Sequence, residues 1–212
     1  MKRNFALRYI AYLAVLTALV LVATIIVVIP MPTGVGAYLN FGDVVIFVAS
    51  AILGPRGGFV CGGLGSALAD VIYAPTFALL TFIVKGLEGL MCGTIVWMFK
   101  KYVKNEKVKD FVSYVVAFVV SGLWMMFGYY VGTGVMLGVI NGGEYVSGFA
   151  TALLNIPNDS IQASVSIVVG YGLTIALLRI RYVRGIQEEI FNYKRKKKQE
   201  IPQETDEQNT DI

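Results

Sequence analysis

The sequence predicts an all-α integral membrane protein with six transmembrane helices and with both the N- and C-termini cytoplasmic. Two observations support this prediction. Of the 212 residues, 56% are hydrophobic and only 15% are charged, and the mean hydropathy of +0.67 is far above that of a soluble domain of ordinary composition. Apolar runs of about 20 residues, the length that crosses roughly 30 Å of hydrocarbon as a helix, also recur along most of the chain.

The six expected helices follow from these runs in chain order. They cover residues 6–30, 41–54, 57–74, 77–99, 111–138 and 147–180. The first run follows basic residues, as in a secretory signal, but no small-residue cleavage site ends it, so we expect a retained helix. The second and third runs are short, and the tripeptide Pro55-Arg56-Gly57 between them has room only for a tight turn at one membrane face.

The distribution of Lys and Arg supports this count and orients the helices. With the N-terminus inside, the segments on the cytoplasmic side hold every Lys and Arg except Lys85. The outside links "MPTGVGAYLN", "YAPT" and "VINGGEYVSG" contain neither residue type. Basic loops stay cytoplasmic in membrane proteins. Five or seven helices would place the lysines of the link 100–110 opposite another basic cluster, so six helices are favoured.

The composition changes after the last apolar run and divides the chain into two parts. Residues 1–185 are expected to form the six-helix membrane domain, and residues 186–212 a cytoplasmic tail. The basic stretch "KRKKK" at 194–198 is expected to bind anionic lipid, with no nucleic acid as partner. The polar, acidic end that follows it is expected to be disordered.

The signatures of common catalytic and nucleotide-binding sites are missing from the sequence. It contains no His, no HExxH, no nucleophile elbow and no phosphate-binding loop, so we expect no metal, no cofactor and no enzymatic activity. Cys61 and Cys92 lie inside apolar runs, where free Cys behaves as a small hydrophobe. Gly58, Gly62 and Ser66 recur at every fourth position, a pattern that favours close helix packing over nucleotide binding.

Five ionisable residues lie at membrane depth. An ionisable group in hydrocarbon costs about 2.5 to 3.5 kcal/mol even on a mild insertion scale, so each of them needs a partner or a function. From the expected topology, Lys85 and Glu88 lie roughly 12 to 18 Å below the outer surface at about 1.5 Å per residue. The other three, Asp43, Asp70 and Asp159, lie at that depth or nearer the outside, so the charges gather in the outer half of the membrane.

The last apolar run carries a polar stripe. Asn155, Asn158, Asp159 and Gln162 are spaced for one face of a helix, and Pro157 among them frees a backbone carbonyl. Together with Lys85 the stripe predicts a pocket that opens outward and holds both donors and acceptors. The alternative, that these side chains only pair with one another to hold the helices together, stays open.

A long stretch of the chain resembles a known family. The features that carry the resemblance are "LNFGD" at 39–43, "GPRGG" at 54–58, "SALAD" at 66–70, "FIVKGLEG" at 82–89 and "IPNDSIQA" at 156–163. In this order on six helices they are similar to the substrate-binding S component of energy-coupling factor (ECF) vitamin transporters. Ala14 and Ala18 resemble the alanine pair that packs on the family's transmembrane T component.

The resemblance implies a function and partners. An S component binds its vitamin from outside, docks on the T component through its first helix and topples, while two ATPase subunits supply the energy. The resemblance is closest to members proposed for pyridoxine or hydroxymethylpyrimidine, in the cell membrane of bacteria. Riboflavin or another B vitamin is the alternative substrate, although riboflavin binders carry a Lys-Asn pair where this chain has residues 67–70.

The pattern and the resemblance together indicate a set of substrate-binding residues. They are Asn40, Asp43, Asp70, Lys85, Glu88, Asn158 and Gln162. We expect Lys85 to donate to a polar acceptor on the ligand, with Glu88 either accepting from a ligand hydroxyl or holding the ammonium in place. The link "PTGVGAYLN" is expected to close the outer side as a lid.

Two other classes of protein remain as alternatives. A stand-alone secondary transporter or channel would use the buried charges as an ion or proton relay, but no self-similarity indicates inverted repeats. A membrane enzyme would need a nucleophile or a metal cluster, and the sequence shows neither.

Overall fold

The computed structural model describes residues 2–26, 28–30, 38–103 and 106–199, and these form a helical bundle. In chain order the elements are α1 (Lys2–Ile26), β1 (Ile29–Pro30), β2 (Tyr38–Leu39), α2 (Gly42–Tyr73), the short 3-10 helix η1 (Pro75–Phe77), α3 (Ala78–Tyr102), α4 (Glu106–Ile140), α5 (Tyr145–Arg179) and α6 (Arg181–Gln199). The two strands have two residues each and pair antiparallel, with Ile29 opposite Leu39. The expected all-α architecture is therefore confirmed apart from this one short ladder.

Helix α2 reverses direction at Gly54. The φ of Gly54 is 72° and its ψ is −166°, a conformation that glycine adopts without steric cost, and Pro55 follows. A Cβ placed on Gly58 would meet the Ser50 hydroxyl, and one on Gly62 would lie 3.3 Å from the Ile46 side chain. Residues eight and sixteen apart lie roughly 12 and 24 Å apart along a straight helix, so the two halves of α2 must run antiparallel.

Five helices among the described residues are long and apolar enough to cross a membrane. They are Asn4–Ile26, Gly42–Tyr73, Pro75–Tyr102, Asp110–Ile140 and Tyr145–Arg179. This count and the six apolar runs of the sequence differ only at α2, because the runs 41–54 and 57–74 are its two antiparallel halves. The exposed side chains of these helices include many large hydrophobic groups, which are suited to contact with lipid rather than with water.

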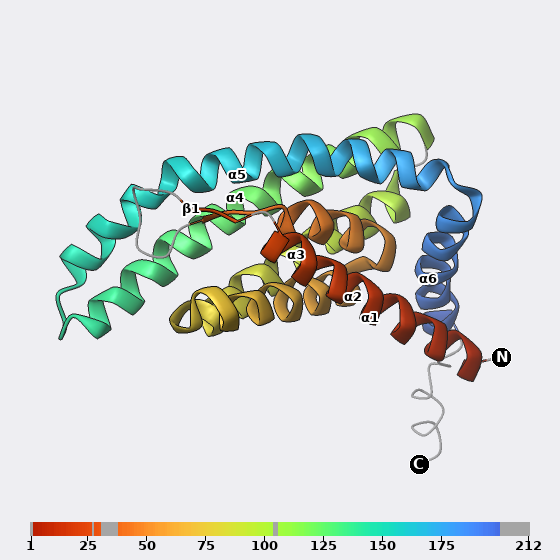
Figure 1. Cartoon of the computed structure of the whole chain (residues 1–212). Helices are drawn as coiled ribbons and strands as arrows, with labels where there is room; N and C mark the ends of the chain where they lie inside the picture. The colour runs from red at the N-terminus through yellow and green to blue at the C-terminus, as the bar shows by residue number, and fades with distance from the viewer. Residues whose placement is uncertain (1, 27, 31–37, 104–105, 200–212) are drawn as a thin grey trace, which may run out of the picture.

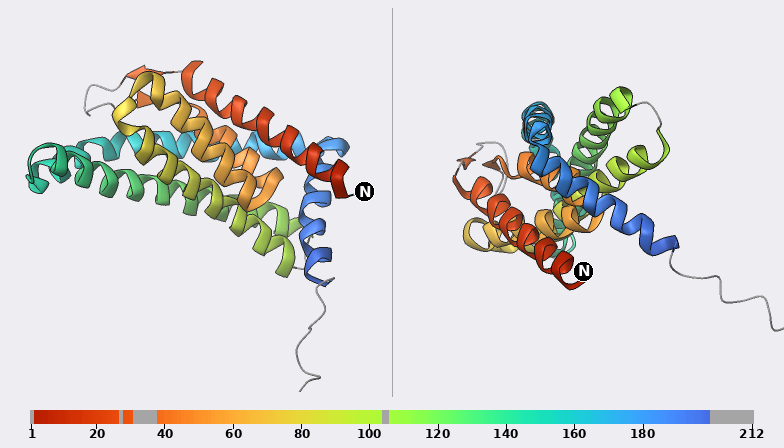
Figure 2. Two further views of the ribbon diagram at one scale, coloured as in Figure 1. Left: turned by 90° about the horizontal axis from the view of Figure 1, so that it is seen from below. Right: turned by 90° about the vertical axis from the view of Figure 1, so that its right-hand side faces the viewer.

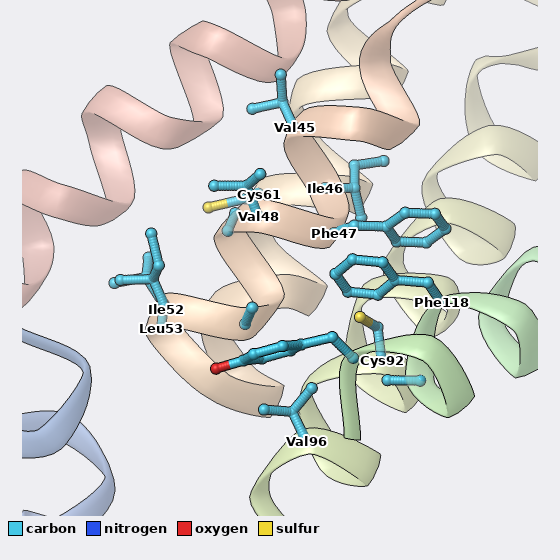
Figure 3. Close-up of a cluster of buried hydrophobic side chains, with 14 of the residues drawn as sticks. Val45, Ile46, Phe47, Val48, Ile52, Leu53, Cys61, Cys92, Val96 and Phe118 are labelled. Carbon is cyan, nitrogen blue, oxygen red and sulfur yellow. The ribbon is translucent and has the colours of Figure 1, made fainter. Parts of the chain in front are cut away.

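The first half of α2 forms the centre of the bundle. Residues 42–54 are all buried, and the ring of Phe47 stacks on that of Phe118 from α4 with centroids 4.7 Å apart, as Figure 3 shows. Helix α1 lies at the periphery, with only 11% of its most apolar window buried. Helices α4 and α5 run side by side and project beyond the others at the end of the bundle away from α6 (Figures 1 and 2).

Glycines allow the second half of α2 to approach α3 closely. A Cβ on Gly58 would collide with the backbone of Gly89, and a Cβ on Gly62 would collide with the carbonyl of Lys85. Gly93 lies equally close to the backbone at Gly54. The packing interpretation of these glycines is confirmed, and the close contact fixes the position of Lys85 relative to α2.

Helix α6 crosses the end of the bundle near the N-terminus of α1 (Figure 2). Gln187 is buried and donates through Nε2 to the Ala51 carbonyl at 2.6 Å and to the Tyr114 hydroxyl at 3.2 Å. Arg8 of α1 pairs with Glu189 at 2.7 Å. The boundary expected between residues 185 and 186 therefore falls inside a packed helix, and the expected disordered end, residues 200–212, lies outside the described residues.

Candidate ligand-binding site

A pocket lies between the helices toward the end of the bundle opposite α6. Its volume is about 70 Å³, several times the roughly 10–15 Å³ that one water needs, so it has room for more than one water molecule. The residues that line it come from α1, the segment before α2, the second half of α2 and the residue after it, η1, α3, α4 and α5. They are Thr24, Asn40, Ser66, Asp70, Ala74, Phe77, Thr81, Lys85, Tyr129, Thr133, Asn155, Asn158, Asp159 and Gln162.

A buried polar chain runs along one side of the pocket. Gln162 Oε1 accepts from the backbone N–H of Asn40 at 3.3 Å and from Asn40 Nδ2 at 3.4 Å, and Gln162 Nε2 donates to Asp43 at 2.8 Å. Lys85 Nζ donates to the other oxygen of Asp43 and pairs with Glu88 Oε2 at 3.1 Å. The chain joins the segment before α2 to α5 and α3, and it places one ammonium between two carboxylates.

The local sequence explains how the first part of this chain is held. The side-chain oxygen of Asn40 accepts the backbone N–H of Gly42 at 2.8 Å, a local bond typical of Asn at the start of a helix. A Cβ on Gly42 would collide with the hydroxyl of Thr24. Only glycine therefore allows α1 to pass this close, and Asp43 in the next position is directed inward and buried, with 1% of its surface exposed.

A second polar chain also lines the pocket. Thr81 of α3 donates to Asp70 at the end of α2, and the Tyr129 hydroxyl of α4 donates to Thr81 at 3.0 Å. The ammonium of Lys85 lies 5.5 Å from the centre of the Tyr129 ring, within the range of a cation–π contact. Lys85 is thus the residue at which the two chains meet.

The polar stripe of α5 lies along the pocket as its spacing predicted. Asn158 and Gln162 are buried, with 2% and 7% of their surfaces exposed, and Asn155 is 9% exposed. The side-chain oxygens of Asn155 and Asn158 accept no hydrogen bond from the part of the chain that the structure describes. Helix α5 continues through Pro157 without a break.

The structure brings all seven expected substrate-binding residues into one region but gives them different positions. Asn40, Asp70, Lys85, Asn158 and Gln162 line the pocket. Asp43 and Glu88 do not line it: Asp43 contacts the lining residues Lys85 and Gln162, and Glu88 contacts Lys85. Of the two expected roles for Glu88, its position favours holding the ammonium over accepting from a ligand. Of the expected lid segment at 32–40, residues 32–37 lie outside the described residues, and residues 38 and 39 form strand β2.

Several lining residues were not expected from the sequence. Thr24, Thr81, Tyr129 and Thr133 stand singly in apolar runs, where a hydroxyl usually bonds to its own helix. One available signal was the spacing of Tyr129 and Thr133, which are four residues apart and therefore share a helix face. In contrast, the expected partner-interface residues Ala14 and Ala18 both lie on the exposed face of α1.

Comparisons with known proteins settle the family. A family model described as "ECF-type riboflavin transporter, S component" matches residues 4–179. The chain belongs to this family. S components are the substrate-binding subunits of vitamin transporters, so the protein is a transmembrane component of vitamin uptake, and the resemblance noted from the sequence is confirmed at this level.

Individual relatives agree with this assignment. A protein of Pyrococcus woesei, named only as an uncharacterized protein in a gap 3'region, is 37% identical over 154 residues, which cover 73% of this chain and 90% of that protein. The S component of a bacterial ECF transporter has a TM-score of 0.60 at 18% identity, over 81% of this chain and 96% of that one. The S component for biotin from an ECF-type ABC transporter has a TM-score of 0.55 at 20% identity, over 82% and 94% of the two chains. At these identities the two structures show a shared fold.

Proposed function

We propose that this S component captures a small vitamin or vitamin precursor from outside the cell and delivers it through a T component and two ATPase subunits. The observation that carries the proposal is the pocket, in which α2, α3, α5 and the segment before α2 bring amides, carboxyl groups and one ammonium together in an S-component fold. Buried polar groups cost free energy unless they are satisfied, and a polar ligand would satisfy the oxygens of Asn155 and Asn158.

Pyridoxine or hydroxymethylpyrimidine is the substrate that we favour. Both are single heteroaromatic rings with small polar substituents, which suit a pocket in which nearly all lining side chains are polar. The sequence between residues 40 and 88 also resembles members of the family proposed for these two compounds. Riboflavin is the second candidate because the matching family model carries its name. Its larger three-ring system would need a wider pocket.

We further propose that the chain crosses the cell membrane of a bacterium six times, with both ends in the cytoplasm. The reversal of α2 at Gly54 supports six crossings, since it divides one of the five long helices into two antiparallel segments. Basic residues lie at the α6 end of the bundle, where Arg8 pairs with Glu189 of α6. Because basic loops face the cytoplasm, the pocket at the other end opens outward.

Binding measurements on the purified protein in detergent test the proposal. Calorimetry or fluorescence titration against pyridoxine, hydroxymethylpyrimidine, riboflavin and other B vitamins should find one ligand with submicromolar Kd. Asn158→Ala should weaken that binding by about tenfold, the equivalent of one lost hydrogen bond. The matched control is Asn141→Ala, which changes an exposed residue in the α4–α5 turn and should bind normally.

The ATPase partners are tested by uptake. Cells that express this chain alone should not accumulate the vitamin, and co-expression of the T component and ATPases should restore accumulation. Accumulation by the chain alone would instead favour a secondary transporter. A folded protein that binds no member of the vitamin panel would refute the proposed function.

A further inference from the structure

The pocket and its polar chains hold more carboxyl groups than positively charged groups. Asp70 and Asp159 line the pocket, and Asp43 and Glu88 contact it through Lys85. Among the described residues that line or contact the pocket in this way, Lys85 is the single cation. Four carboxyl groups and one ammonium thus line or contact the pocket, and the sequence of the link at 31–37, "MPTGVGA", contains no charged residue.

The ammonium of Lys85 is already committed to two of these carboxylates. It donates to Asp43 and pairs with Glu88 at 3.1 Å, and it makes no ion pair with Asp159. Asp159 makes no hydrogen bond or ion pair with any residue in the described ranges, although it lies at the pocket wall. A carboxylate at membrane depth costs several kcal/mol unless a positive group or a hydrogen-bond donor accompanies it.

The pocket also lacks donors for its buried acceptors. The side-chain oxygens of Asn155 and Asn158 are buried without a hydrogen-bond partner among the described residues, and both residues are at least nine-tenths buried. Asn155, Asn158 and Asp159 lie on the same face of α5. Two residues that line the pocket therefore carry side-chain oxygens without a partner among the described residues.

A metal ion is a poor match for this arrangement. Within the described residues there is no group of three or more His, Cys, Asp or Glu side chains that could hold one. The carboxylates instead surround the pocket singly, each on a different helix segment. A positive charge spread over an organic ligand with N–H donors suits this geometry better.

We propose that the pocket selects a ligand with a positively charged nitrogen that bears N–H donors, such as a protonated amine or an aminopyrimidinium, over neutral and anionic ligands of the same shape. The positive nitrogen lies against Asp159, and its N–H groups, or those of a neighbouring amino group, bond to the amide oxygens of Asn155 and Asn158. This inference rests on the proposed function, because it names the charge class of the substrate taken up through the same site.

The test uses ligands that share one ring and differ in charge at one substituent. Pyridoxamine carries an ammonium where pyridoxine carries a hydroxyl and 4-pyridoxic acid carries a carboxylate. Calorimetry on the purified protein should find pyridoxamine bound about ten- to a hundredfold more tightly than pyridoxine, as expected for a hydrogen bond to a charged group, and 4-pyridoxic acid bound most weakly. Hydroxymethylpyrimidine and its aminomethyl analogue form a second pair in which the amine should bind more tightly.

A matched pair of variants locates the preference. Asp159→Asn keeps the shape of the side chain and removes its charge, so it should reduce the preference for pyridoxamine over pyridoxine by about tenfold. Glu144→Gln removes the same charge from an exposed residue at the start of α5 and should leave the preference unchanged. Thermal unfolding of both variants confirms that they are folded.

The possible outcomes separate this inference from the proposed function. Pyridoxine binding as tightly as pyridoxamine to the wild type, or riboflavin binding while the amines do not, would overturn the charge preference and leave the function standing. A preference that Asp159→Asn does not reduce would overturn the assignment to Asp159. Binding of none of these compounds by the folded wild type would overturn both proposals.

Discussion

Replacing Lys85 by Met removes the one ammonium that holds two buried carboxylates together. Asp43 and Glu88 are 1% and 0% exposed, so neither can recover its lost partner from water. Asp43 keeps the amide donor of Gln162 at 2.8 Å, whereas neither oxygen of Glu88 accepts a hydrogen bond from the described residues. Met retains most of the apolar stem of Lys, so the change is mainly one of charge.

The magnitude follows from leaving a buried charge uncompensated. Breaking a buried ion pair by removing one partner costs about 3 to 5 kcal/mol, and a whole domain is commonly stable by only about 5 to 15 kcal/mol. Lys85→Met should therefore lower the midpoint of thermal unfolding in detergent by about 10 °C. The triple variant Lys85→Met, Glu88→Gln and Asp43→Asn leaves no charged residue in the polar chain that runs from Gln162 to Glu88. It should therefore recover most of that lost stability.

Thermal unfolding and ligand binding, measured on the same samples, decide between two roles of Lys85. If Lys85 also contacts the ligand, the triple variant should be stable yet bind one to two orders of magnitude more weakly, since a hydrogen bond to a charged group contributes about 1.5 to 3 kcal/mol. A stable triple variant with full affinity would limit the role of Lys85 to structure. If the variant Lys85→Met unfolds at the same temperature as the wild type, the reasoning is refuted altogether.

Two further predictions concern the partner surface and the topology. Ala14 and Ala18 lie on the exposed face of α1, so Ala18→Trp should block co-purification with the T component while ligand binding by the isolated chain stays normal. Loss of both, with an unfolded protein, would instead mean that Ala18 packs within the bundle. Reporters fused after Asn105 and at the C-terminus should indicate the cytoplasm, and one inserted at Gly143 should indicate the outside. Finding Asn105 and Gly143 on the same side would contradict six crossings.

The elements of this fold were largely predictable from the sequence because lipid imposes a simple length and polarity rule. The run at 6–30 corresponds to α1, but α1 already ends at Ile26 and the last two residues of the run form strand β1. The turn expected at Pro55-Arg56-Gly57 lies one residue from the reversal at Gly54. Helix α6 was missed because its strongly charged sequence resembles a tail. The spacing of Ile186 and Ile190, which places both on one face, was the available signal for a packed helix.

The candidate site was predictable as a set of residues but not as a set of contacts. The cost of a buried charge marks Lys85 as important, and helical spacing brings Lys85 and Glu88 together. The stronger contact of Lys85 is with Asp43, 42 residues earlier in the chain. That contact depends on the fold of α2 against α3, which no local pattern specifies. Hydroxyls such as Tyr129 enter the pocket for the same reason.

The buried segment at 42–54 of α2 is fixed at both of its ends, with a consequence for how the protein moves. At one end Asp43 bonds to α3 and α5, and at the other the Ala51 carbonyl bonds to Gln187 of α6. The segment is therefore hydrogen-bonded to neighbouring helices near both of its ends. We therefore expect a change of shape on ligand binding to move the elements around this segment and not the segment itself. If the whole protein rotates in the membrane, the pocket and α6 should rotate together.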